Sequence, residues 1–324
     1  MLLAPVFRVS FAWSRTVFIV LFFVVFSAND MRVAAADKNI DALTTQKQRR
    51  RTSILRGAGN IDDTSCTLKR ATHQLVEPIH AVGYPGSGNL VLISLVQALT
   101  GMSAEGSDVG VPPPEPYNYI TYVSHELAHA RTFSRLILLL RNPLKAIPSL
   151  CNFHYERVHL QKDLMGHHKV QAPMEFWIPF RDERFDEELT LWKNTVEYWV
   201  DAYDNKEESG YYRLVISFES LVDQYVGPLE TTRLARFLNE THQVSTAPAE
   251  QMPCLWNKIV GQDDGQVRAS RRREEGDDVM FTLEQLDKIT QVLKELTIKY
   301  YESEFVHWFY HYQKDVNKER ERLL

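Results

Sequence analysis

Apolar and polar positions divide the chain into short apolar runs that alternate with longer amphipathic segments. The run "RLILLLR", residues 135–141, has no polar interruption, which is typical of a strand buried on both faces of a parallel sheet. Within residues 187–203, apolar side chains recur three and four positions apart from Leu189 to Tyr203, which predicts an amphipathic helix. Strands that alternate with helices predict an α/β fold with a mostly parallel sheet flanked by helices.

The other predicted elements follow the same alternation. We expect further strands at residues 77–84, 119–125 and 211–218. We expect further helices at residues 89–99, from Pro143 onward, at about 227–238, and two within 282–318. With 324 residues, of which 44% are hydrophobic and 24% charged, the chain can bury one large core. Its net charge of −5 argues against a general nucleic-acid binder, which would carry a basic face.

The N-terminal region contains an uncharged apolar segment, "TVFIVLFFVVFSA" at residues 16–28, preceded by Arg8 and Arg15. Its length suits the core of a signal peptide better than a full membrane span of about 20 residues. It also suits a short signal anchor if the flank from Phe11 is included and Arg15 snorkels. We expect residues 1–36 to form such an anchor, with a signal peptide cleaved after Ala36 as the alternative. Both place the remaining chain in the lumen of the secretory pathway.

The segment that follows is polar, and its charge run at residues 46–51 is typical of a flexible spacer. We therefore expect a stem at residues 37–72 and one folded domain at residues 73–324. With an anchor, the protein is a type II membrane protein of the Golgi or another secretory compartment. With a cleaved signal peptide, it is secreted.

An oxidising lumen permits two covalent features. The three cysteines allow one disulfide and leave one thiol, and we predict the pair Cys66–Cys254. The sequon at residues 239–241 is an acceptor for an N-linked glycan.

A glycine-rich loop, "GYPGSGNL" at residues 83–90, lies between the predicted strand 77–84 and the predicted helix 89–99. Its three glycines let backbone N–H groups turn inward, and the following helix adds positive potential, so the loop can hold a phosphate. Asn89 and Leu90 stand where a nucleotide hydrolase has Lys and Ser or Thr. ATP or GTP hydrolysis would lack both its phosphate clamp and its metal ligand.

A second anion-binding group is predicted at the end of the strand 135–141. In "LLLRNPLKAIPS", Arg141 ends the strand and Ser149 follows eight residues later, past a helical turn opened by Pro143. A guanidinium and a hydroxyl that converge there would bind a further phosphate.

The stretches "YPGSGN" and "RNPLKAIPS" together resemble the two signature motifs of the PAPS-dependent sulfotransferases. The resemblance covers about residues 77–312 and includes "LVISFESL" at 214–221. The stretch "CLWNKIVGQDDGQVRASRRR" is similar to the Golgi-type sulfotransferases that carry WSC domains, although no WSC domain is present here. The resemblance implies a P-loop NTPase-like fold and sulfuryl transfer from PAPS to a hydroxyl of a glycan, lipid or protein, without a metal.

The resemblance also assigns roles to individual residues. The loop would bind the 5′-phosphosulfate through Pro85, Gly86, Ser87, Gly88, Asn89 and Leu90, with the Ser87 hydroxyl near the reacting group. Arg141 and Ser149 would bind the 3′-phosphate. Arg271 and Arg272, in "RRREEGDDVMFTLEQL", would also reach that phosphate. His125, at the end of "TYVSHE", would be the general base.

Four positions depart from the family pattern. The family usually has Lys or Arg at Gly86, a hydroxyl residue at Leu90, often an aromatic at Val91 and frequently Lys at Val123. A missing cation at the leaving oxygen can cost about 10²- to 10³-fold in rate. Lys145 or an arginine within 271–273 is the candidate replacement. A PAPS- or PAP-binding protein with weak catalysis is therefore one alternative function.

A zinc peptidase is another alternative, because residues 125–129 read "HELAH". On a helix, His125 and His129 would bind one metal ion and Glu126 would act as the base. His154 or Glu156 would be the third ligand. The run that starts by Arg135 reads as a strand, however, whereas a zinc-binding helix should continue.

Overall fold

The computed structural model describes residues 66, 68–69, 75–106, 119–160, 170–240, 244–261 and 281–324. The chain divides into a unit Met1–Asp63, which lies outside the described residues, and a compact unit Thr64–Leu324, which contains all of them. The predicted anchor and most of the predicted stem therefore lie outside the described part. Within that part, no helix is both long enough and apolar enough to span a membrane.

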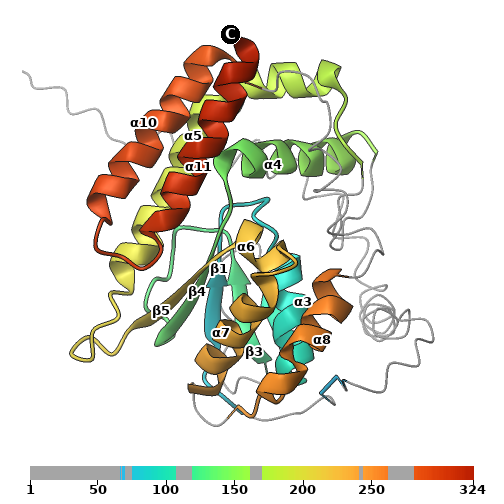
Figure 1. Ribbon diagram of the computed structural model, residues 1–324, viewed down its shortest axis with the longest axis vertical. Helices are drawn as coiled ribbons and strands as arrows, with labels where there is room; N and C mark the ends of the chain where they lie inside the picture. The colour runs from blue at the N-terminus through green and yellow to red at the C-terminus, as the bar shows by residue number, and fades with distance from the viewer. Residues whose placement is uncertain are drawn as a thin grey trace, which may run out of the picture. The chain divides into compact units, whose positions relative to one another are not determined.

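The centre of the unit is a five-stranded sheet in which every strand pair is parallel (Figure 1). The strands are β1 (Ile79–Val82), β2 (Ser103–Gly106), β3 (Tyr119–Ser124), β4 (Arg135–Leu140) and β5 (Tyr212–Ser217). Their order is β2-β3-β1-β4-β5, so the chain extends the sheet to one side of β1 and then to the other. The predicted α/β class and parallel sheet are confirmed.

Helices connect and cover the strands. They are α3 (Asn89–Thr100), α4 (Pro143–Val158), α5 (Met174–Ala202), α6 (Phe218–Val222), α7 (Gly227–Glu240), α8 (Met252–Trp256), α10 (Leu283–Lys299) and α11 (Val306–Leu323). A 3₁₀ turn, η1 (Ala249–Gln251), precedes α8, and a π turn, η2 (Asn257–Gly261), follows it. Asn142 caps α4 by accepting a hydrogen bond from Leu144 N, and Pro143 occupies the first turn, where its missing N–H costs nothing.

The two faces of the sheet belong to two apolar cores. Along β4, Leu136, Leu138 and Leu140 pack with α4, α5, α10 and α11, whereas Ile137 and Leu139 pack with α3, α7 and α8. This alternation follows from the two-residue period of a strand, and it explains why the run has no polar position. In Figure 1 these two groups of helices lie on opposite sides of the strands.

The short elements η1, α8 and η2 were not predicted, and neither were β2 and α6. The strand β2 reads "SAEG", which lacks an apolar run, and its register with β3 shifts between Ser103 and Ala104. The helix α6 is a single short helix that starts directly where β5 ends. Both depend on tertiary contacts, which local hydrophobic periodicity does not report.

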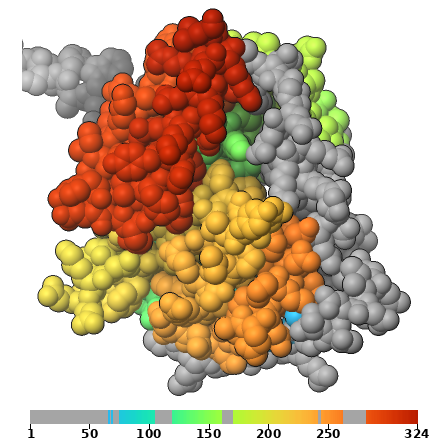
Figure 2. Space-filling view, viewed as in Figure 1, coloured from blue at the N-terminus to red at the C-terminus, as the bar shows by residue number. Residues whose placement is uncertain are grey.

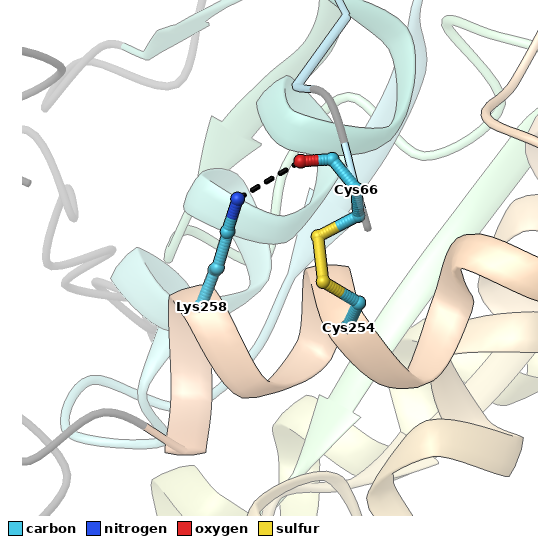
Figure 3. The surroundings of a disulfide bond; sticks show 3 residues. All are labelled: Cys66, Cys254 and Lys258. Atoms are coloured by element: carbon cyan, nitrogen blue, oxygen red, sulfur yellow. Dashed lines mark hydrogen bonds between the residues drawn. A yellow bond between two sulfur atoms is a disulfide. The ribbon is translucent and has the colours of Figure 1, made fainter. Parts of the chain in front are cut away.

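The predicted disulfide is confirmed: Cys66 is bonded to Cys254 of α8, with Cα atoms 6.0 Å apart (Figure 3). Lys258 donates a hydrogen bond from Nζ to the carbonyl oxygen of Cys66 at 2.9 Å. Lys69 donates to the carbonyl oxygen of Ser245. These contacts fix Cys66 and Lys69 to the domain, and the third cysteine, Cys151, is buried and takes no part in this disulfide.

Candidate functional site

The predicted site residues follow three neighbouring strands at one edge of the sheet, and Phe218, which was not predicted as a site residue, follows a fourth. His125 follows β3, the glycine loop follows β1, Arg141 follows β4, and Phe218 follows β5. The carboxyl ends of parallel strands meet at the same edge, and ligands of open α/β sheets bind where the strand order reverses. Here that point is between β1 and β4. Segments up to 135 residues apart in the sequence are thereby brought to one edge.

The glycine loop is a tight turn closed by its own backbone. Ser87 N donates to Tyr84 O at 3.0 Å, and Gly88, with φ of 95°, is the N-cap of α3 without a side-chain cap. The first N–H groups of a helix have no acceptor within the helix, so those of Asn89 and Leu90 point out of the N-terminus of α3. This is the backbone arrangement that binds an anion.

All three loop glycines lack room for a side chain, and at Gly83 a Cβ would lie 2.8 Å from the carbonyl oxygen of Leu139. A Cβ at Gly86, which has φ of 90°, would lie 2.7 Å from the carbonyl oxygen of Ala146 and 3.0 Å from the backbone N of Leu150. A Cβ at Gly88 would lie 2.3 Å from the Phe218 ring. The loop is pressed against α4 and α6. A lysine in place of Gly86 would therefore not fit this arrangement.

Polar atoms of the loop are buried without partners. The Ser87 hydroxyl (1% exposed) and both amide atoms of Asn89 (7% exposed) have no hydrogen-bond partner among the described residues. A buried polar atom without a partner costs about 1–3 kcal/mol. An anion held at the N-terminus of α3 would offset this cost by accepting bonds from the hydroxyl and the amide.

Arg141 touches the loop directly. Its Nη1 donates to the carbonyl oxygen of Gly86 at 2.6 Å, and its guanidinium lies 4.5 Å from the centre of the Phe218 ring. The side chain is 5% exposed. The predicted partner Ser149 is close by, because a Cβ at Gly86 would lie 3.3 Å from Ser149 Cβ. The structure thus brings together the three residues that the sequence placed in two separate motifs.

A buried tyrosine connects the glycine loop to α5. Tyr84 donates from its hydroxyl to Glu188 of α5 at 2.8 Å, and Arg184 forms an ion pair with the same carboxylate. Burial and the adjacent Glu188 charge raise the pKa of Tyr84 far above its usual range. Burial also raises the pKa of Glu188. Tyr84 therefore stays protonated and remains a hydrogen-bond donor.

His125, which follows β3, contacts the first residue of the glycine loop. Its Nδ1 is 2.8 Å from the carbonyl oxygen of Gly83. A carbonyl oxygen only accepts, so Nδ1 carries the proton, and in the neutral ring Nε2 carries the lone pair. This tautomer is the one that a general base requires.

The arrangement required for a zinc peptidase is not formed. Residues 125–134 are irregular, and His129 has φ of 57°, so "HELAH" is not a helix and the two histidines do not share a helical face. Glu156 accepts a hydrogen bond from Val170 N. Among the residues that the structure describes, no group of three His, Cys, Asp or Glu side chains is arranged to hold a metal ion.

Of the remaining predicted site residues, the structure describes Pro85 and Leu90 but not Arg271 and Arg272. Pro85 and Leu90 belong to the same loop and first turn as Ser87, and Leu90 is 38% exposed. Arg271 and Arg272 lie outside the described residues. Their role stays a prediction.

Sequence reasoning missed a carboxylate network behind Arg141. Glu219, directly after Phe218, accepts hydrogen bonds from Asn142 N, Ser217 Oγ and Tyr312 OH at 3.0, 2.9 and 3.0 Å. The pair Phe218–Glu219 at a strand end is visible in the sequence, but its partner Tyr312 is 93 residues away. Nothing local in the sequence indicates that contact.

Comparisons with known proteins give a likeness to solved structures alone. No model of a protein family matches the chain, and no curated protein matches it. A crystal structure of the mouse sulfotransferase SULT7A1 complexed with PAP is similar to it at 16% sequence identity and a TM-score of 0.44. The match covers 75% of this chain and 90% of that chain. The function of this chain therefore has to follow from its own side chains.

Proposed function

We propose that this protein is a PAPS-dependent sulfotransferase that moves a sulfuryl group to a hydroxyl of a glycan, lipid or protein. The observation that carries the proposal is the glycine loop, where Ser87 and Asn89 bury unbonded polar atoms beside the Arg141 guanidinium. A neutral ligand would not use this combination of helix N-terminus and cation. An anion with two separated phosphate-type groups would use both.

The residues divide between the two ends of such a donor. The loop from Pro85 to Leu90 would hold the phosphosulfate through backbone N–H groups and the Ser87 hydroxyl. Arg141 and Ser149 would bind the 3′-phosphate, together with Arg271 and Arg272. When bound, PAPS supplies the sulfuryl group that is transferred.

His125 would take the proton of the acceptor hydroxyl at Nε2, while Gly83 holds the ring through Nδ1. The acceptor oxygen forms its bond to sulfur, and the bond between sulfur and the phosphate oxygen breaks. Negative charge then grows on the departing phosphate, where the N–H groups of the loop stabilise it. Positioning and electrostatics supply most of the acceleration, as in phosphoryl transfer.

A donor-binding protein with weak catalysis is the second candidate. The observation that favours it is the close contact of Gly86 with α4, which leaves no room for the lysine or arginine that the resemblance expects there. We propose that Lys145, in the first turn of α4, replaces the missing cation at the leaving oxygen.

Calorimetric titration with adenosine 3′,5′-bisphosphate, with ATP as the control, tests donor binding. We expect saturable binding of the bisphosphate and much weaker binding of ATP, which lacks a 3′-phosphate. A folded protein that binds neither compound overturns both candidates. If the bisphosphate binds, transfer of labelled sulfate from PAPS to mixed glycan, lipid and peptide acceptors separates the enzyme from the weak catalyst.

We also propose that the protein acts in the secretory lumen, anchored through residues 1–36 as a type II membrane protein of the Golgi. The disulfide Cys66–Cys254 supports an oxidising compartment.

Asn239, in the last turn of α7, is exposed and starts the sequon. We expect an enzyme that removes N-linked glycans to increase the gel mobility of the protein, and Asn239→Gln to abolish that shift. If carbonate releases the protein from membranes without detergent, the protein is not anchored and is the secreted form.

A further inference from the structure

The peptide group that joins Arg141 to Asn142 is held at both ends. Its carbonyl oxygen, from Arg141, accepts a hydrogen bond from Trp192 Nε1 at 2.9 Å. Its N–H, from Asn142, donates to Glu219 Oε1 at 3.0 Å. Both bonds are made by side chains of other elements, α5 and α6. They fix the plane of this peptide and with it the direction in which the Arg141 side chain leaves the backbone.

The Asn142 side chain adds two further bonds. Its Oδ1 accepts from Leu144 N at 3.0 Å, and its Nδ2 donates to Asp315 Oδ2 of α11 at 3.0 Å. Asn142 is completely buried. The turn between β4 and α4 is therefore tied to the C-terminal helix as well as to α6.

Glu219 is itself held by α11. Its Oε2 accepts from Tyr312 OH at 3.0 Å and from Ser217 Oγ at 2.9 Å, and these two hydroxyls are 3.1 Å apart. Burial and the Glu219 charge raise the pKa of Tyr312 well above its usual value, so its hydroxyl stays a donor. In Figure 2 green side chains, the colour of the α4 region, are visible between α11 in red and the gold segment that contains α6.

We propose that Glu219 is a positioning residue for Arg141, and that Tyr312 of α11 holds Glu219 in the orientation that this requires. The C-terminal helix, which contributes no residue to the glycine loop, thereby sets the guanidinium that the proposed function assigns to the 3′-phosphate. The inference rests on that proposed function for the identity of the ligand. It assigns Glu219 no contact with the donor.

The test is Glu219→Gln. An amide has one acceptor oxygen and one donor nitrogen, so it cannot accept from Asn142 N–H at one end and from two hydroxyls at the other. We expect the affinity for adenosine 3′,5′-bisphosphate to fall at least tenfold. We expect the affinity for adenosine 5′-monophosphate, which lacks the 3′-phosphate, to change much less, so the preference for the bisphosphate shrinks.

Glu230→Gln is the matched control, because Glu230 is a buried carboxylate of α7 that pairs with Arg233 of the same helix. It should leave the preference for the bisphosphate unchanged. Tyr312→Phe removes a single hydroxyl from the network and keeps the ring. It should also reduce the preference for the bisphosphate over the monophosphate. If Glu219→Gln does not fold, this variant tests the positioning role.

The outcomes separate the two proposals. If the wild-type chain binds the bisphosphate and folded Glu219→Gln retains its full preference over the monophosphate, the positioning role is wrong and the donor site stands. Equal losses for both nucleotides also contradict the positioning role, because they indicate general damage to the site. If the wild-type chain binds neither nucleotide, the donor site fails first and the positioning role fails with it.

Discussion

The guanidinium of Arg141 and the carbonyl oxygen of Gly86 are joined by a hydrogen bond of 2.6 Å. This bond links the loop after β1 to the end of β4, the two neighbouring strands at which the strand order reverses. The Phe218 ring, 4.5 Å from the guanidinium, supports the same side chain from the start of α6. Arg141 therefore shapes the loop as well as offering charge to a ligand.

We predict that Arg141→Lys weakens binding of adenosine 3′,5′-bisphosphate by about 10- to 100-fold, since hydrogen bonds to charged groups contribute about 1.5–3 kcal/mol. Lysine keeps the charge but lacks the planar fork that can bond Gly86 and a phosphate together. Calorimetric titration measures the change. Arg135→Lys is the control, because Arg135 lies at the opposite end of β4 and packs on Tyr212 and Phe237. Equal affinities for the wild type and Arg141→Lys would contradict the assignment.

We predict that Gly86→Ala destabilises the protein more than Gly210→Ala does. Both glycines have positive φ, 90° and 68°, which costs an alanine about 1–2 kcal/mol. A Cβ at Gly210 meets nothing within 4 Å, whereas a Cβ at Gly86 meets the backbone of α4 at 2.7 Å. Urea unfolding measures the difference. If the two variants lose the same free energy of unfolding, the loop is less tightly packed on α4 than described.

Much of the fold followed from local patterns. The run 135–141 identified β4 because both of its faces are buried, and "GYPGSGN" identified the turn because it places glycines between an apolar strand and a helix. Pro143 marked the start of α4 in the same way. These signals are local, so a single sequence contains them.

The rest of the site depends on contacts between distant segments. The Arg141–Gly86 bond joins residues 55 positions apart, and Tyr312 reaches Glu219 across 93 positions. No periodicity reports such pairs. The expectation that "HELAH" could be a metal-binding helix was wrong because the segment before β4 turns sharply at His129 and Arg131, both with positive φ. Positive φ is uncommon for any residue other than glycine, and Arg is not among the types enriched there, so the turn has no clear sequence signal.

We predict that loss of the disulfide destabilises the domain without changing donor affinity. The bond closes a long loop between Cys66 and Cys254, and removing a native disulfide typically costs about 2–5 kcal/mol. A reducing agent should lower the unfolding temperature of the wild type and of Cys151→Ala, but not that of Cys66→Ser/Cys254→Ser. If the reducing agent also lowers the unfolding temperature of the double variant, another disulfide bond is responsible for the effect.

We predict that acid destabilises the protein through His80 of β1. This side chain is 1% exposed, neither ring nitrogen has a hydrogen-bond partner among the described residues, and the rings of Tyr122, Phe133 and Trp199 surround it. Burial, and to a lesser degree His129, lowers the pKa of His80 to about 4. Its charged form is therefore disfavoured in the folded state.

The sign and size of the effect follow from this shift. Below its unfolded pKa of about 6.5, the unfolded state binds a proton that the folded state refuses, so stability falls as the pH decreases and levels off below about 4. Between pH 7.5 and pH 5.5 the loss due to His80 is about 1 kcal/mol. Urea unfolding at both pH values should show the wild type losing this much more than His80→Leu, which has no group to titrate. Parallel losses in the two proteins would mean that His80 accepts its proton in the folded state and is not the neutral core residue described here.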